Sequence, residues 1–196
     1  VTIGGGTISG NSIGINSSVI NRDVNVKGLG KNKGNNKGIE FSKLTNSATV
    51  TDTWVGIDIN GTSIELGSGK IVTVYRNNYG IWRGTINGGS VKTYNGSEGN
   101  DNCIKDTNIA KGTIDVQKNV TGIVNGTIGN GATLTIKGNT TGINGALINK
   151  AGLSVEGVAK GTGTGVINSN INQNITIYNT ETGINLTNKT ISAGNV

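Results

Sequence analysis

A Gly residue followed by Ile or Val recurs along this 196-residue chain, and its period constrains the fold more than any other feature. The copies are Gly14-Ile15, Gly38-Ile39, Gly56-Ile57, Gly80-Ile81, Gly122-Ile123, Gly142-Ile143, Gly165-Val166 and Gly183-Ile184. A ninth copy, Cys103-Ile104, carries Cys in place of Gly, and the mean interval is about 21 residues. Self-similarity at such a period is the mark of a repeat architecture, in which each unit packs on its neighbours. The chain is therefore expected to fold as a solenoid.

Two further apolar positions accompany each pair. One lies five residues after the Ile, as in Ile20 and Leu44. The other is an apolar–x–apolar triplet, found at 24–26, 48–50, 72–74, 114–116, 134–136, 153–155 and 175–177, in degenerate form at 91–93, and at 1–3 for a coil that starts before Val1. β-branched residues at period two predict strands rather than helices. The pattern predicts an all-β, right-handed parallel β-helix: about nine coils of about 21 residues with three short strands each, in one segment covering 1–196.

Gly and Asn residues separate these positions and indicate turns. Asn follows the second apolar position at Asn21, Asn87, Asn149 and Asn172. Stacked Asn side chains can hydrogen-bond to their counterparts one coil above and below, so an Asn ladder is expected at this corner.

Four corners between a triplet and the next Gly-Ile pair are longer than the rest, at 4–14, 27–38, 94–103 and 156–165. They should project from one edge, where repeat proteins often bind partners, although tolerated variation in loop length would look the same. The second contains Lys27, Lys31, Lys33 and Lys37 and no acidic residue. These four lysines are candidate contacts for phosphate or sulfate groups, and a solvated basic loop is the alternative.

Most aromatic residues fall in one part of the repeat. Tyr75 and Tyr94 should be vertical neighbours on the outward side of the triplet strands, and Trp82 should point outward after its Gly-Ile pair, with Trp54 and Tyr79 at the preceding corner. Exposed aromatic rings can hold a sugar ring or a partner side chain. We take Tyr75, Tyr94 and Trp82 as candidate binding residues, with a ladder that stiffens the surface as the alternative.

Charge and cysteine content narrow the range of partners. The net charge of +6 is spread along the chain, so it is interpreted as a solvated basic surface and no nucleic-acid partner is expected. There is no apolar run of the length that crosses a membrane. The single Cys103 cannot form an internal disulfide.

The composition offers few side chains of the kinds that enzymes use for catalysis. The chain has no His, which removes the commonest general base, and it lacks an Asp/Glu cluster with metal-ligand spacing. Glu40 and Asp58 each follow a Gly-Ile pair and should lie one rung apart on the outer face, where they are expected to be a solvated pair of like charges. No catalytic residue, metal or cofactor is predicted.

The Gly-Ile coils, such as Gly122-Ile-Val-Asn-Gly-Thr-Ile128 and Gly142-Ile-Asn-Gly-Ala-Leu-Ile148, resemble the passenger domains of bacterial autotransporters, including adhesin-type and vacuolating-toxin-like passengers. The Gly, Asn and Thr bias and the absence of disulfides fit the same family. The resemblance implies export through the outer membrane, followed by display on the cell surface or release for adhesion or toxicity.

The resulting functional expectation is a non-enzymatic, virulence-type passenger segment that adheres to a protein or glycan of a host or neighbouring cell. Two alternatives stay open: a structural spacer within a larger secreted toxin or adhesin, and a carbohydrate-active β-helix related to polysaccharide lyases or glycosidases. Both ends read as open coil ends, where end-to-end or lateral self-association is conceivable.

Overall fold

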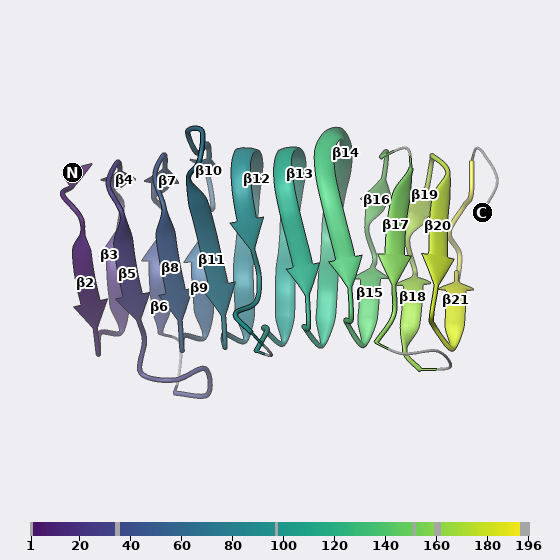
Figure 1. Ribbon diagram of the computed structural model, residues 1–196, viewed down its shortest axis with the longest axis horizontal. Coiled ribbons are helices and arrows are strands. Elements are labelled where there is room, and N and C mark those ends of the chain that lie inside the picture. Colours follow the sequence, from purple (N-terminus) through teal and green to yellow (C-terminus); the bar gives the residue numbers. More distant parts are fainter. Residues whose placement is uncertain (1, 34–35, 97, 151, 159–161, 193–196) are drawn as a thin grey trace.

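The computed structural model is a parallel β-helix of about eight turns, and it describes residues 2–33, 36–96, 98–150, 152–158 and 162–192. In Figure 1 the chain advances from left to right, while the strands in front run downward and those behind run upward, which makes the coil right-handed. The predicted fold is thus confirmed, with nine Gly-Ile positions separated by eight steps. Every assigned strand belongs to one hydrogen-bonded sheet whose interstrand pairs are parallel.

Each turn presents three faces, named here in the order of the repeat. Face one carries the Gly-Ile strands: β3 (Ile13–Asn16), β6 (Lys37–Glu40), β9 (Val55–Asp58), β15 (Thr141–Asn144), β18 (Thr164–Ile167) and β21 (Thr182–Asn185). Face two carries strands of two residues: β1 (Thr2–Ile3), β4 (Val19–Ile20), β7 (Lys43–Leu44), β10 (Ser63–Ile64), β16 (Leu147–Ile148) and β19 (Asn170–Ile171). Face three carries the triplet strands: β2 (Gly6–Ser9), β5 (Val24–Lys27), β8 (Ala48–Thr51), β11 (Ile71–Tyr75), β17 (Leu153–Glu156) and β20 (Ile175–Tyr178).

Three central coils differ, because one bent strand passes through all three faces. These strands are β12 (Tyr79–Lys92), β13 (Asn102–Gln117) and β14 (Thr121–Lys137). β13 and β14 are paired from Asn102↔Thr121 to Gln117↔Lys137, with a register shift between Ile109 and Lys111. The backbone ladder is therefore most continuous in the middle of the molecule.

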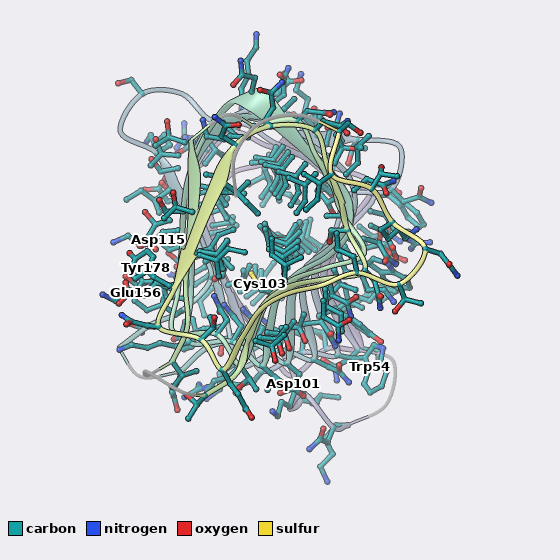
Figure 2. All side chains as sticks on the ribbon, turned by 90° about the vertical axis from the view of Figure 1, so that its right-hand side faces the viewer. Trp54, Asp101, Cys103, Asp115, Glu156 and Tyr178 are labelled. Carbon is teal, nitrogen blue, oxygen red and sulfur yellow. The ribbon has the colours of Figure 1, made fainter. Side chains whose placement is uncertain are left out.

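The core consists of apolar columns that run the length of the coil, visible end-on in Figure 2. Ile15 pairs with Ile39, and the same column continues through Ile57 to Ile184. Rungs stack about 4.8 Å apart, and full burial of each Ile or Val contributes roughly 1.5–3 kcal/mol. Most of the first two columns is buried completely, including Ile39, Ile57, Ile81, Leu44 and Ile86.

The first coil departs from its predicted register. Ile3 lies opposite Ile20 on face two, and the triplet strand of this coil is β2, in which Ile8 lies opposite Val26. The segment 1–3 is therefore not a triplet. Thr7 is the first outward residue of the face-three strands, and 4–14 is not a corner insertion because it contains β2. Val1 itself lies outside the described residues.

The coil that begins at Ile57 absorbs two extra residues without losing a core position. Ile64 lies opposite both Leu44 and Ile86, so it fills the second column. Ile59 is buried at the intervening corner, where the Thr62 N–H donates to the Ile59 carbonyl oxygen across 2.8 Å. The second apolar position of this coil thus lies seven rather than five residues after its Ile, and the two extra residues form a local bulge.

Left-handed backbone conformations form the corner between faces one and two. The residue two positions after the Gly-Ile isoleucine has positive φ in most coils, including Phe41 at 47°, Arg83 at 56° and Asp106 at 50°. Such angles are uncommon for residues other than Gly, Asn and Asp. The corner therefore fixes the direction in which these side chains leave the backbone.

Candidate functional site

An aromatic cluster lies on the outer side of face one. It consists of Trp54 at the corner before β9, and of Tyr79 and Trp82 on β12. The Trp54 and Tyr79 rings meet edge to face with centroids 5.9 Å apart, and the Tyr79 and Trp82 rings stack with centroids 5.6 Å apart. Figure 2 shows Trp54 pointing away from the core. Aromatic pairs in these geometries add about 0.5–1.5 kcal/mol beyond the area they bury.

Cations complete the surroundings of this cluster. Arg83 lies over the Trp82 ring, with Cζ 4.1 Å from the centroid, and Lys105 lies 5.0 Å from the Tyr79 centroid. The Trp82 Nε1–H donates to the Asp106 carboxylate across 3.0 Å. The same carboxylate is 3.9 Å from the Lys105 Nζ. Both the ring and the polar edge of Trp82 are therefore occupied by other groups of the chain.

Next to the cluster lies an ionic quartet made of Lys37, Glu40, Asp58 and Arg83, in which the two carboxylates are buried and the two cations are partly exposed. Glu40 and Asp58 are paired in register, as their spacing predicts. They are 6% and 0% exposed, so the expectation of a solvated pair is wrong. Arg83 hydrogen-bonds to Asp58 through both Nε and Nη2, and Lys37 contacts both carboxylates. Burial of two carboxylates is tolerated because each has a cationic partner.

The ammonium group of Lys37 illustrates the balance of forces in this quartet. Burial works to lower its pKa, because it disfavours the charged form. The hydrogen bonds and charges of Glu40 and Asp58 outweigh that effect, and the pKa of Lys37 is raised. Lys37 thus stays a cation, and its charge is paired with the Glu40 and Asp58 carboxylates of the same chain.

A ladder of buried Asn side chains runs along the corner between faces three and one. Asn77 donates to Asn100, Asn100 to Asn119 and Asn119 to Asn139, with donor–acceptor distances between 3.0 and 3.2 Å. Each Oδ1 also accepts the backbone N–H of the preceding rung, as between Asn77 and Asn100. This ladder was not predicted from the sequence. The sequence feature that could have indicated it is a polar residue, Asn or Thr, four positions before the Gly-Ile isoleucine.

The Asn ladder expected at the other corner forms only in part. Asn172 donates to Asn149 across 2.8 Å, as predicted. Asn21 and Asn87 are exposed, and the Asn21 carbonyl oxygen accepts a hydrogen bond from Asn46 instead.

Three longer corners project from the edge between faces three and one, as Figure 1 shows along its lower side. They are the predicted insertions 27–38, 94–103 and 156–165, of which residues 34–35, 97 and 159–161 lie outside the described residues. Between the first two lie the short corners at Asp52 and Arg76. Together they form a cleft of about 360 Å³, called here the saddle, which is lined by Lys31, Asp52, Arg76, Glu98 and Gly99.

Ion pairs connect the loops and short corners that form the saddle. Arg76 contacts Asp52 at 2.7 Å and Glu98 at 3.2 Å, and Lys31 contacts Asp101 at 2.7 Å. The hydrogen bond to Asp52 is the main cause of the raised pKa of the Arg76 guanidinium. These contacts link the two longer loops over the short corners between them.

The four candidate lysines are not equivalent. Lys27 and Lys33 are exposed, whereas Lys31 is paired with Asp101 and Lys37 belongs to the ionic quartet. The segment is thus less basic than its sequence indicates, because acidic residues outside it, Glu40, Asp58 and Asp101, neutralise two of the lysines. A phosphate or sulfate ligand would meet Lys27 and Lys33 rather than all four.

The three candidate aromatic residues lie on two faces. Tyr75 and Tyr94 lie on or just after the face-three strands, and Trp82 lies on face one. Arg76 lies over the Tyr75 ring and Lys118 over the Tyr94 ring, and the Tyr94 hydroxyl donates to Asp115 across 3.0 Å. The ring–ring contacts of the described residues join Trp54, Tyr79 and Trp82, and do not include the expected Tyr75–Tyr94 pair.

Cys103 points into the core, as labelled in Figure 2. It is fully buried, and burial is the largest cause of the raised pKa of its thiol, which lies within hydrogen-bonding reach of Thr93. Two departures from the repeat, Cys in a Gly position and Thr at the end of a triplet, therefore contact each other.

Among the described residues, no group of three or more His, Cys, Asp or Glu side chains is placed to hold a metal ion. Nor does the described chain contain a helix long and apolar enough to cross a membrane.

Comparisons with known proteins return no relative. No protein-family model matches the chain, and neither the curated proteins nor the solved structures contain a significant match. The fold and the side-chain geometry of the outer surface are therefore what indicates a function.

Proposed function

We propose that this chain is the rod segment of a secreted or surface-displayed bacterial passenger protein, and that it adheres to a host or neighbouring cell. The observation that carries the proposal is the aromatic cluster of Trp54, Tyr79 and Trp82 on the outer side of face one. A solenoid core needs no aromatic residues outside it, and large, partly exposed aromatic residues beside Arg are typical of interaction sites. The β-helix is consistent with an autotransporter passenger, and display at the outer membrane follows from that resemblance.

The spacer role is the alternative that a specific observation favours. The Trp82 ring and its Nε1–H are occupied by Tyr79, Arg83 and Asp106, as expected for a ladder that stiffens the surface. Trp54 is the residue at which adhesion and the spacer role can be distinguished, because the ring contact it makes in the described structure is the edge-to-face contact with Tyr79. Glu40 and Asp58 give the carbohydrate-active alternative little support, because general acid–base work needs a carboxyl group that can exchange protons with a substrate.

Binding of the purified chain to cell surfaces tests the proposal. Saturable binding that weakens at least tenfold in a Trp54→Ala, Tyr79→Ala variant supports adhesion through face one. A Tyr75→Ala, Tyr94→Ala variant is the matched control, since it removes two aromatic side chains from face three. Absence of saturable binding by the folded chain would favour the spacer, and loss caused only by the control variant would move the adhesive surface to face three.

A further inference from the structure

Trp54 differs from the other two rings of the cluster in what surrounds it. Trp82 is stacked on Tyr79, lies under Arg83 and donates to Asp106, and Tyr79 is contacted by both indoles and by Lys105. Among the described residues, Trp54 makes an edge-to-face contact with Tyr79, and its side chain is partly exposed. Trp54 is thus the member of the cluster with the fewest ring and cation contacts among the described residues, and the one best suited to contact a ligand.

The backbone holds Trp54 firmly although the residue lies at a corner. Its N–H donates to the Asn36 side chain across 3.2 Å, and its carbonyl oxygen accepts the Tyr79 N–H across 2.9 Å. Thr53 and Val55 on either side are fully buried. A ring held in this way loses little conformational entropy when a ligand binds, which favours affinity.

Most charged groups of face one and of the saddle are paired within the protein, and Lys33, on the loop that contacts the Trp54 backbone through Asn36, is exposed. On face one Arg83 is paired with Asp58, and Lys105 lies near Asp106. At the saddle, which opens on the edge next to Trp54, Lys31 is paired with Asp101, and Arg76 with Asp52 and Glu98. A strongly charged ligand would have to compete with these internal pairs. An uncharged ligand with many hydroxyl groups could donate to the acids and accept from the bases while the pairs stay in place.

We propose that Trp54 is the stacking platform of a binding site for an uncharged pyranose sugar, with hydroxyl contacts from the flanking charged pairs. The C–H groups on one face of a pyranose ring carry partial positive charge and pack against the negative face of an indole. The platform is supported by its edge-to-face contact with Tyr79, which is itself stacked on Trp82. This inference rests on the proposed adhesive function and names its ligand class as a neutral glycan of the contacted cell surface.

Tryptophan fluorescence gives a direct test, because the chain has two Trp residues. A Trp82→Phe variant keeps only the Trp54 indole, and its matched control, Trp54→Phe, keeps only that of Trp82. Neutral oligosaccharides from a glycan array should shift the emission of the first variant saturably, with an affinity that is unchanged between low and raised salt. Trp54→Ala should weaken binding at least tenfold in the otherwise unchanged chain, whereas Tyr75→Ala should leave it unchanged.

Three results would overturn the inference. Binding restricted to sulfated or uronic-acid glycans, and lost at raised salt, would assign the site to an anionic ligand. Equal binding by the chain and by its Trp54→Ala variant would remove the platform. Saturable cell binding that survives periodate oxidation of the cell-surface glycans would identify a protein partner, and would leave adhesion itself standing.

Discussion

At the scale of single residues, Gly38 shows why the repeat requires Gly before Ile. A Cβ atom added there would lie 2.2 Å from the Val50 Cγ1 atom and 2.6 Å from the carbonyl oxygen of Gly56 in the next coil. Gly183 occupies the same position in the last described coil, and an added Cβ would have no neighbour within 4 Å. The Gly is needed for the approach of two rungs rather than for an unusual backbone angle, since neither residue has positive φ.

This contrast gives a matched pair of substitutions. Gly38→Ala should lower the free energy of unfolding by about 2–3 kcal/mol, because the added Cβ would clash both with the backbone of the next coil and with the fully buried Val50 side chain. Gly183→Ala should change it by no more than about 0.5 kcal/mol. Urea unfolding followed by circular dichroism measures both values, and equal effects of the two substitutions would show that rung contact is not the cause.

Tyr94 provides a test of the electrostatics of face three. Burial, followed by the hydrogen bond to the Asp115 carboxylate, raises the pKa of the Tyr94 hydroxyl above 10.0. The folded pKa exceeds the unfolded one, so the associated stabilisation is complete below pH 10 and is lost as the pH rises through the folded pKa. Spectrophotometric titration of Tyr94 in the native protein should show the raised pKa, and Asp115→Asn should lower it. An unchanged titration in that variant would mean that the hydrogen bond does not form in solution.

At the scale of elements, the Asn ladder ties each corner to the next. Asn100 accepts two hydrogen bonds from Asn77, and its Nδ2 donates to Asn119 and to the carbonyl oxygens of Val74 and Thr93. These groups are buried, so truncation would leave several of them without a partner, at a cost of roughly 1–3 kcal/mol each.

Asn100→Ala is therefore expected to destabilise the protein by about 3 kcal/mol. Asn149→Ala is the control, because the Asn149–Asn172 bond lies at a partly exposed corner and its loss should cost less than about 1 kcal/mol. In the coil before that of Asn77, the ladder position is filled by Thr, and the Thr53 hydroxyl donates to Asn77 across 2.7 Å. Asn100→Thr should thus recover part of the lost stability in the same unfolding experiment, and no difference between Ala and Thr would argue against the ladder.

The inward elements could be predicted from the sequence because their determinant is local. Ile57 and Ile81 are brought into register by spacing alone, since alternation at period two fixes which side chains face the core. The outward site depends on contacts between coils, which spacing does not specify. The adjacency of Glu40 and Asp58 was predictable, whereas their burial depends on Arg83, which reaches back from the next coil.

At the scale of the whole molecule, a solenoid behaves as a one-dimensional stack whose stability is approximately the sum of intrinsic coil terms and nearest-neighbour terms. The neighbour terms are unequal here. β13 is paired over most of its length with β12 on one side and β14 on the other, whereas the outer coils pair through strands of two to five residues. The central coils should therefore open last.

Hydrogen exchange resolves this gradient along the chain. Amides of β13 should exchange most slowly, and those of β2 and β21 should exchange fastest, because opening an end breaks one interface and opening the middle breaks two. In Gly38→Ala, exchange should accelerate in β6 and β9, which flank the substituted contact, while β18 keeps its protection. If all strands instead exchanged at one rate in both proteins, the coils would unfold as a single cooperative unit, and a ligand bound at Trp54 would stabilise the entire rod rather than its own coils.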